Sequence, residues 1–409
     1  MIRADSTQAA VARAISTNGG TATVGGVVVG GDFPGLGIVR SLGRQGVPVC
    51  VVDDEQSISR FSRYCTLSVR VPDLRDELRT VEALLELDER FELTGWVLFA
   101  TRDEIVAAIS RHSDVLADRY RIPVARWDAI RCACDKRNLY GLGEELGIPV
   151  PRTWRATTLE ELDALDLQFP VAVKPAIKER FIYETKAKAW RANTRTELRE
   201  LYQKAATVID PAEILLQDLI PGDGRHQYAY CAFYKDGRSI GSMTARRRRQ
   251  HPPEFGRAST FVETVDVPEL EEYSGRLLDA LDFYGLVELE YKHDPRDDQF
   301  RLLDFNARAW GYHSLGAVAG VDFPYLLFAD QLGLEVEPRR ARPGVRWIRF
   351  MTDVPTALVE MKTGRLDLRS YLRTVLGGFD VEAVFSCEDP RPGLAEIALV
   401  PYLMKTRGF

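Results

Sequence analysis

Residues 285–311 of the chain read GLVELEYKHDPRDDQFRLLDFNARAWG. Two apolar stretches flank the polar turn HDPRDDQ, which predicts an antiparallel hairpin. Asp304 and Asn306 lie two residues apart on the second strand, so their side chains project from one face, where Glu290 of the first strand can join them. Carboxylate and amide oxygens suit Mg²⁺, which favours carboxylates together with nucleotide phosphates. Arg308 continues the same face and would point toward the same polyanion.

A solvated hairpin face is the ordinary alternative for such acids. The neighbours, however, are apolar, and buried charges need partners. These neighbours are Leu286, Val287, Leu289, Leu302, Leu303 and Phe305. The burial argument therefore favours a metal site.

Lysine is rare in this chain, because only ten of the 54 basic residues are Lys and the other 44 are Arg. Lys174 ends the apolar strand PVAVKPA (170–176), and Lys136 begins a helix, where acids are normally favoured. A surface salt bridge would explain either residue alone. Together they favour a phosphate clamp, since a charge at the end of a buried strand needs an anion.

The segment EILLQDLIPGDG (213–224) is an apolar strand that runs into a Pro-Gly turn. If a nucleotide lies beside it, the backbone after Gln217 can contact the adenine edge and Asp223 the ribose hydroxyls. An ordinary strand end is the alternative.

A glycine turn, VVVGGDFPGLG (27–37), follows a strand and opens a helix, a context in which backbone N–H groups can hold an anion. Asp53 lies where a dinucleotide site carries its ribose-binding acid. The glycines do not form G-x-G-x-x-G, and Pro34 occupies the turn. A tight turn, a small-ligand contact and a nicotinamide site all stay open.

The bulk composition excludes several classes of protein. With 54 Lys+Arg against 60 Asp+Glu, the net charge of −6 gives no general attraction to nucleic acid or anionic membranes. No run approaches the roughly 18 to 20 apolar residues that span a bilayer, and six cysteines are too sparse for a disulfide framework. We therefore expect a cytoplasmic protein with neither nucleic acid nor a membrane as partner.

The order of patterns divides the chain. Residues 1–23 lack an apolar period and predict a disordered tail. From residue 24 to about 125, alternating strands and helices predict an α/β unit with a parallel sheet. Beyond the linker IPVP (148–151), short turns between strands predict an α+β unit with mainly antiparallel pairing. Residues 336–409 predict a small α+β segment.

In order and spacing, these motifs resemble the ATP-grasp superfamily: a βαβ domain, a Lys opening a helix that leads to GIPVP, a VKP strand, a strand ending in QDLIPGDG, and E…D-x-N-x-R. The resemblance covers about residues 26–335 and is strongest to its predicted carboxylate–amine ligases. It implies a Rossmann-like pre-ATP-grasp domain over 24–125 and an ATP-grasp domain over 126–335. The latter would comprise a small lid subdomain at about 150–218 and a large subdomain at about 219–335.

The resemblance also implies site residues. Lys174 and Arg308 would be catalytic, Arg308 by steadying the transferred phosphoryl group. Two Mg²⁺ ions, or Mn²⁺ in their place, would bind to Glu290, Asp304 and Asn306. The residues expected to contact ATP are Lys136, Lys174, Lys178, Gln217, Asp218, Leu219, Ile220, Asp223, Arg246 and Arg248.

Two of these assignments depend on an arginine run, Arg246–Arg249, which lies between predicted strands. Alternate members, Arg246 and Arg248, can point inward to a substrate carboxylate, because guanidinium pairs bidentately with carboxylates. A solvated turn or a sheet edge is the alternative.

Three positions depart from the family pattern. Asp304 replaces the usual Glu, and Asp218 follows Gln217 where the family often has an acid. The usual Gly/Ser-rich phosphate loop is replaced by AIKERFIYETKAKA (176–189), which offers lysines instead of backbone N–H groups.

The implied activity is ATP-dependent ligation of a small-molecule carboxylate to an amine through an acyl phosphate, and a homodimer is compatible with it. Three alternatives stay open: a thiol or carboxylation acceptor on the same fold, an NAD(P)-dependent oxidoreductase that uses the glycine turn, and a nucleotide sensor without turnover.

Overall fold

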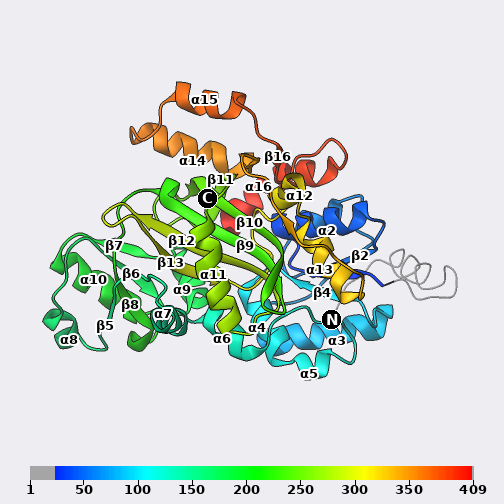
Figure 1. The fold of residues 1–409 in the computed structure, drawn as a ribbon, viewed down its shortest axis with the longest axis horizontal. Coiled ribbons are helices and arrows are strands. Elements are labelled where there is room, and N and C mark those ends of the chain that lie inside the picture. Colours follow the sequence, from blue (N-terminus) through cyan, green and yellow to red (C-terminus); the bar gives the residue numbers. More distant parts are fainter. Residues whose placement is uncertain (1–23, 408–409) are drawn as a thin grey trace.

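The computed structural model describes residues 24–407, in which three sheets follow one another along the chain (Figure 1). The predicted tail, 1–23, lies outside the described residues. No helix among the residues described is long and apolar enough to cross a membrane.

The first sheet is parallel, with strand order β3-β2-β1-β4. Its central strands are completely buried runs of small and branched apolar residues, as is typical of a sheet covered on both faces. The elements of this unit are β1 (Gly26–Val29), α2 (Phe33–Arg44), β2 (Val49–Asp53), the 3₁₀ turn η1 (Ser59–Phe61), β3 (Leu67–Arg70), α3 (Glu77–Phe91), β4 (Val97–Ala100), α4 (Asp103–Arg111) and α5 (Ser113–Leu116).

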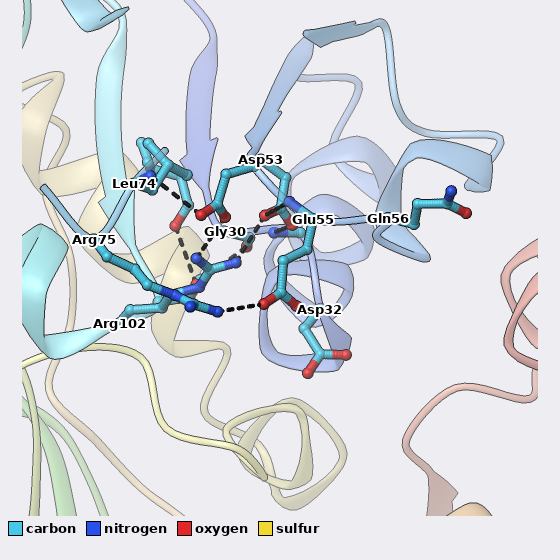
Figure 2. Close-up of polar contacts among 12 residues, drawn as sticks. Gly30, Asp32, Asp53, Glu55, Gln56, Leu74, Arg75 and Arg102 are labelled. Carbon is cyan, nitrogen blue, oxygen red and sulfur yellow. Dashed lines mark hydrogen bonds and ion pairs between the residues drawn. The ribbon is translucent and has the colours of Figure 1, made fainter. Parts of the chain in front are cut away.

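The glycine turn is a tight strand-to-helix connection. Gly30 has φ +95°, a conformation that side chains disfavour, and an added Cβ would collide with Thr101. The buried Asp53 accepts the Gly31 N–H at 2.6 Å and pairs with Arg102 at 2.7 Å (Figure 2). Its carboxylate is therefore engaged within the protein, which disfavours the nicotinamide interpretation.

The second sheet is antiparallel, with order β5-β8-β6-β7, and it carries its own apolar core under helices α8 and α10 (Figure 1). The elements that follow the first unit, up to the end of this sheet, are α6 (Trp127–Cys134), α7 (Lys136–Glu145), β5 (Thr153–Arg155), α8 (Leu159–Ala164), β6 (Val171–Pro175), α9 (Lys178–Thr185), β7 (Trp190–Ala192), α10 (Arg195–Ala206), η2 (Pro211–Glu213) and β8 (Ile214–Asp218).

The third sheet has eight strands, in the order β13-β12-β9-β10-β11-β15-β16, with β14 pairing with β10. Its first five strands pair antiparallel, as predicted. The elements are η3 (Gly224–His226), β9 (Gln227–Lys235), β10 (Arg238–His251), β11 (Ala258–Val265), α11 (Pro268–Ala280), β12 (Gly285–Asp294), β13 (Gln299–Asn306), α12 (Ser314–Ala319) and α13 (Phe323–Gln331).

The C-terminal segment completes this third sheet. Its short strands extend the sheet edge or pair beside it, and α14 and α15 cover one end of the molecule (Figure 1). The elements are β14 (Arg339–Arg340), β15 (Arg346–Ile348), α14 (Phe350–Lys362), α15 (Leu368–Leu376), β16 (Val381–Glu382) and α16 (Arg391–Arg407).

The predicted fold class, a parallel α/β domain followed by mainly antiparallel sheets, is confirmed. Two local predictions were wrong. Residues Arg246–Arg249 continue strand β10 rather than forming a turn between strands. The segment 176–189, expected as a loop, contains helix α9.

Candidate active site

A cavity of about 630 Å³ is lined by strands β6 and β8 of the second sheet and β12 and β13 of the third. Ten residues predicted from the sequence line it. They are Lys136, Lys174, Lys178, Gln217, Asp218, Leu219, Ile220, Asp223, Glu290 and Asp304.

The acidic hairpin pairs as its alternation predicted. Glu290 lies directly opposite Asp304, and Glu288 lies opposite Asn306, so all four side chains share one face. All four are buried. The Asn306 amide nitrogen donates to Glu288 at 3.1 Å and to Glu290 at 3.4 Å.

Cations neutralise these acids in the described structure. Lys136 forms an ion pair with Asp304, Lys178 donates to the Asn306 amide oxygen at 3.0 Å, and Arg247 lies 2.7 Å from Glu290. Burial opposes ionisation of Asp304, but the charges of Lys136, Lys178 and Lys188 outweigh it and hold the pKa of this carboxyl well below its usual range. The site thus concentrates positive charge around ionised carboxylates.

Glu288 differs from its neighbours. Burial and repulsion from Glu290 raise the pKa of Glu288 to about 7, although Arg247 and a hydrogen bond from Tyr312 oppose the rise. The Tyr312 hydroxyl donates to Glu288 at 2.6 Å. Sequence alternation placed Glu288 on the right face but did not assign it a role.

The donor set fits a divalent cation in chemistry. Glu290, Asp304 and the Asn306 amide offer hard oxygen ligands on adjacent strands beside an ammonium-lined cavity. In residues 24–407, no three His, Cys, Asp or Glu side chains already form a metal-binding group. Asn306 presents its nitrogen to the acids, so ligation through its oxygen requires the amide to turn over.

Lys174 lies at the end of β6, as predicted, and its ammonium is held by two neighbours. It donates to the Tyr140 hydroxyl at 2.8 Å and to the Gln217 side-chain oxygen at 2.9 Å. The Gln217 amide nitrogen donates to Thr153 at 3.0 Å. These contacts bring the predicted phosphate lysine and the predicted adenine strand together.

The turn after β8 is fixed by a residue that the sequence did not single out. Lys292, on β12, donates to the carbonyl oxygens of Ile220 at 2.8 Å and Gly222 at 2.9 Å. Asp218 and Asp223 border the cavity at this turn but are each paired with an arginine, Asp218 with Arg296 and Asp223 with Arg225, both at 2.7 Å.

Arg308 lies next to the cavity rather than in its lining. Its guanidinium makes two bonds of 3.0 Å to Asp103, at the start of α4, and one of 3.2 Å to Asn306. Asp103 also pairs with Lys178 at 2.9 Å. Burial opposes ionisation of Asp103, yet these two cations lower its pKa. Nothing in the local sequence marked Asp103, because its partners lie far away along the chain.

The arginine run corrects a prediction. Arg246 and Arg248 do not line the 630 Å³ cavity: Arg246 donates to the Arg225 carbonyl oxygen at 2.9 Å, and Arg248 pairs with Glu263. Arg247 points to Glu290 instead.

Strand register explains that difference. Ala245 on β10 lies opposite Ala229 on β9, which in turn lies opposite Glu290 on β12. Residues that share this register share a face, so Arg247, two positions beyond Ala245, reaches the acid, whereas Arg246 faces the other side.

Helix α9 takes the place of the glycine loop. Lys178 is its first residue, and Lys188, three residues beyond its end, also lines the cavity. Burial lowers the pKa of Lys188, while Glu290 and Asp304 oppose that effect. Lys186 lies outside this cavity. Five lysines therefore line this cavity: Lys136, Lys174, Lys178, Lys188 and Lys292.

The sequence is similar to that of a curated ligase. The chain is 24% identical to D-aspartate ligase of Enterococcus faecium (strain Aus0004) over 301 residues, which cover 69% of this chain and 70% of the ligase. No family model matches the sequence.

Solved structures share the fold. An L-amino acid ligase from Bacillus licheniformis superposes with a TM-score of 0.60 at 15% identity, covering 76% of this chain and 74% of the ligase. An N5-carboxyaminoimidazole synthetase from Staphylococcus aureus, complexed with ADP, gives 0.62 at 15% identity, covering 79% of this chain and 80% of the synthetase. The three-sheet architecture and these likenesses agree: the chain shares the fold of the L-amino acid ligase and of the synthetase, as the resemblance to the ATP-grasp superfamily predicted.

Proposed function

We propose that the protein is an ATP-dependent carboxylate–amine ligase, which activates a carboxylate as an acyl phosphate and joins it to an amine with release of ADP and phosphate. The observation that carries the proposal is that five lysines line one cavity together with the ionised carboxylates of Glu290 and Asp304. The likeness to a D-aspartate ligase and an L-amino acid ligase supports the same chemistry.

In the first step, an oxygen of the substrate carboxylate attacks the γ-phosphorus of ATP, the bond to the bridging oxygen breaks, and ADP leaves. Lys136 and Lys174 bind the phosphates, and Arg308 steadies the transferred group. In the second step the amine attacks the acyl carbon, phosphate leaves, and the nitrogen loses a proton. The protein contributes positioning and charge stabilisation, so a side-chain nucleophile is not needed.

Glu290, Asp304 and Asn306 hold Mg²⁺ in this proposal, with two ions as the expected number. When bound, the metal neutralises phosphate charge and acts as a Lewis acid. Lys136 now neutralises Asp304, so it can turn to the phosphates once a cation replaces it, whereas Lys178 also stays paired with Asp103. The chain's six free thiols and its use of ATP favour the cytoplasmic location. A homodimer stays a prediction.

The test is ADP release from Mg-ATP with a panel of amino acids and dipeptides as acids and amines, followed by mass spectrometry of the product. Lys174→Met should lower kcat/KM by roughly 10² to 10³-fold, because it removes a donor to developing charge. Lys362→Met, at an exposed lysine of α14, is the matched control and should behave like the wild type.

Turnover by Lys174→Met at the wild-type rate would contradict the proposal, as would ATP binding without ADP release for every acid and amine pair. A thioester or carboxylated product would instead identify the alternative acceptors.

A metal requirement is a separate prediction. EDTA should abolish ADP release, and Mg²⁺ or Mn²⁺ should restore it, because both cations accept carboxylate oxygens. Asp304→Asn should raise the Mg²⁺ concentration needed for half-maximal activity, since it removes one anionic ligand. Full activity in EDTA would show that the acidic pair has another role.

A further inference from the structure

Two helices of the C-terminal segment, α14 and α15, take no part in the chemistry above. They lie at one end of the molecule, outside the third sheet (Figure 1). A surface helix normally turns its apolar residues to the core and its polar residues to water. Both of these helices do the opposite, so their outer sides are the unusual surface of the described chain.

Helix α14 turns polar residues to the sheet. Thr352, Asp353 and Thr356 are buried. Asp353 accepts hydrogen bonds from the Arg249 guanidinium and from the Thr260 hydroxyl, at 2.8 Å each. These polar contacts fix the helix with its apolar side outward. The large apolar residues exposed on that side are Val354, Leu358 and Val359.

Helix α15 shows the same reversal more strongly. Ser370 and Thr374 line a polar cavity of about 380 Å³ between this helix and the third sheet, and the Tyr371 ring lies 5.1 Å from the Arg249 guanidinium. No residue of α15 is buried. Leucines recur every four residues on the other side of the helix, which places them in one row. They are Leu368 at 59% exposure, Leu372 at 45% and Leu376 at 81%.

These exposed residues form a group. Single exposed apolar residues are ordinary, whereas a cluster marks an interaction site. Of the fifteen large apolar residues exposed within the described chain, seven fall between residues 354 and 379. Phe379, just beyond α15, packs on Phe350 at the start of α14 with ring centroids 5.2 Å apart, which joins the two helices. We call the seven the apolar helical face: Val354, Leu358, Val359, Leu368, Leu372, Leu376 and Phe379.

The exposed charges beside this face are mainly positive. Three acids of the same stretch are engaged with the protein: Asp367 accepts the Ser370 N–H at 2.9 Å, Asp380 accepts the Arg346 N–H at 2.8 Å, and the half-buried Glu360 lines the polar cavity. The basic side chains of the stretch are all exposed. They are Lys362, Arg365, Arg369 and Arg373.

The shape and charge of α15 distinguish between possible occupants. The hollow along it is lined by residues of this one helix, so it lacks the second wall with which a groove holds a partner helix. Two copies of the chain meeting at this face about a two-fold axis would bring Arg369 and Arg373 of each copy together, and like charges repel. An anionic lipid surface needs no second wall and attracts both arginines.

We propose that α14 and α15 dock the protein onto an anionic lipid surface. The apolar helical face enters the boundary between headgroups and acyl chains, and Arg369 and Arg373 contact the lipid phosphates. Composition predicted no membrane partner, because the net charge of −6 gives no general attraction to anionic membranes. Docking therefore depends on this local face, and it is reversible binding at the interface rather than insertion. The proposal goes beyond the ligase function and does not depend on it.

Vesicle flotation tests the docking in the absence of ATP. The full chain is mixed with vesicles of phosphatidylcholine alone, or of phosphatidylcholine with phosphatidylglycerol, and the protein that floats with the vesicles is measured. The wild type should partition onto the anionic vesicles roughly tenfold better than onto the neutral ones, because each arginine near an anionic surface adds to the binding. High salt should reduce this preference, because it screens the charges.

Two double variants separate the apolar and the charged contributions. Leu372→Gln with Leu376→Gln should lower partitioning onto anionic vesicles by roughly tenfold or more, because it removes apolar surface from the contact. Arg369→Gln with Arg373→Gln should remove most of the preference for anionic vesicles, and Arg369→Lys with Arg373→Lys should retain it.

Matched controls lie at exposed positions elsewhere. Leu78→Gln with Val115→Gln, and Arg126→Gln with Arg155→Gln, should float like the wild type. Thermal unfolding should give the same midpoint for every variant, because all the substituted side chains are exposed. This separates lost docking from lost folding.

The proposal is overturned if the wild type floats with neither kind of vesicle, or equally with both. It is also overturned if the folded leucine variant floats like the wild type. Sedimentation equilibrium tests the second copy as occupant: a dimer that Leu372→Gln with Leu376→Gln converts to a monomer would assign this face to self-association instead of lipid.

Discussion

Arg247 is the side chain on which the acidic cluster depends most directly. It is 7% exposed, and its guanidinium lies 2.7 Å from Glu290 and 2.9 Å from the Gln227 side-chain oxygen. Removal of one partner leaves the other charge buried and uncompensated, which typically costs about 3 to 5 kcal/mol. We therefore expect Arg247→Met to lower the free energy of unfolding by about 3 kcal/mol, measured by urea titration.

Its neighbour supplies the control. Arg246 is half-buried and makes a solvent-exposed hydrogen bond to the Arg225 carbonyl oxygen, so Arg246→Met should cost less than about 1 kcal/mol. Equal losses for Arg246→Met and Arg247→Met would contradict the strand register that places only Arg247 against Glu290.

For single residues, the sequence predicted which side chains of a strand share a face, but not which face of β10 points toward the acidic cluster. Asp304, Asn306 and Glu290 could be grouped because alternation along two strands and one hairpin turn fixes which side chains meet. The inward arginine could not be identified, because a one-residue shift in register exchanges the two faces of β10, and that register depends on β9.

Helix α9 is the element in which this chain departs furthest from a glycine loop. It is attached to α4 by two polar contacts: Lys178 pairs with Asp103 at 2.9 Å, and the Tyr183 hydroxyl donates to Glu104 at 2.5 Å. The sequence of 176–189 indicated lysine donors instead of backbone ones. It could not indicate that α9 contacts α4, because the two acids of α4 lie more than seventy residues earlier in the chain.

Tyr183→Phe should loosen this element while leaving the rest of the fold intact. It removes a hydrogen bond to a carboxylate, a class worth about 1.5 to 3 kcal/mol when buried and less here because both groups are partly exposed. Hydrogen exchange of residues 178–185 should speed up several-fold, measured by mass spectrometry. Local opening with few buried contacts produces this kind of selective change.

A matched tyrosine distinguishes this effect from a general one. Tyr273 donates to Glu269 at 2.7 Å within helix α11, far from α9 in the sequence. Tyr273→Phe should leave exchange in 178–185 unchanged. Unchanged exchange in Tyr183→Phe would show that α9 is held by its apolar contacts, chiefly the buried Phe181, rather than by Glu104.

At the scale of the molecule, long-range contacts join the parallel sheet unit to the rest. Arg308 reaches Asp103, and the buried Arg40 pairs with Asp389 at 3.0 Å. The strand patterns predicted a parallel sheet and then mainly antiparallel pairing, which the structure divides between two sheets. They could not predict how the C-terminal segment joins the third sheet, because β14 and β16 are two residues each.

His313 lies at the same junction and makes it sensitive to acid. The residue is 2% exposed, its Nε2 lies 2.8 Å from the Pro34 carbonyl oxygen, and burial lowers its pKa to about 4. An unfolded histidine titrates near 6.5, so between pH 6.5 and 4 the unfolded chain binds more protons than the folded one. Stability from this group is therefore complete above pH 6.5 and is lost as the pH falls through that window.

At about 1.4 kcal/mol per pKa unit, the loss is on the order of 3 kcal/mol by pH 4. Other groups titrate in the same range, so the measurement is the difference between the wild type and His313→Asn, followed by urea unfolding from pH 8 to pH 4. His313→Asn should be the less stable of the two at pH 8, because it loses packing against Gly37, and the gap should shrink or reverse on acidification. A gap that stays constant over the whole range would show that His313 does not link this junction to pH.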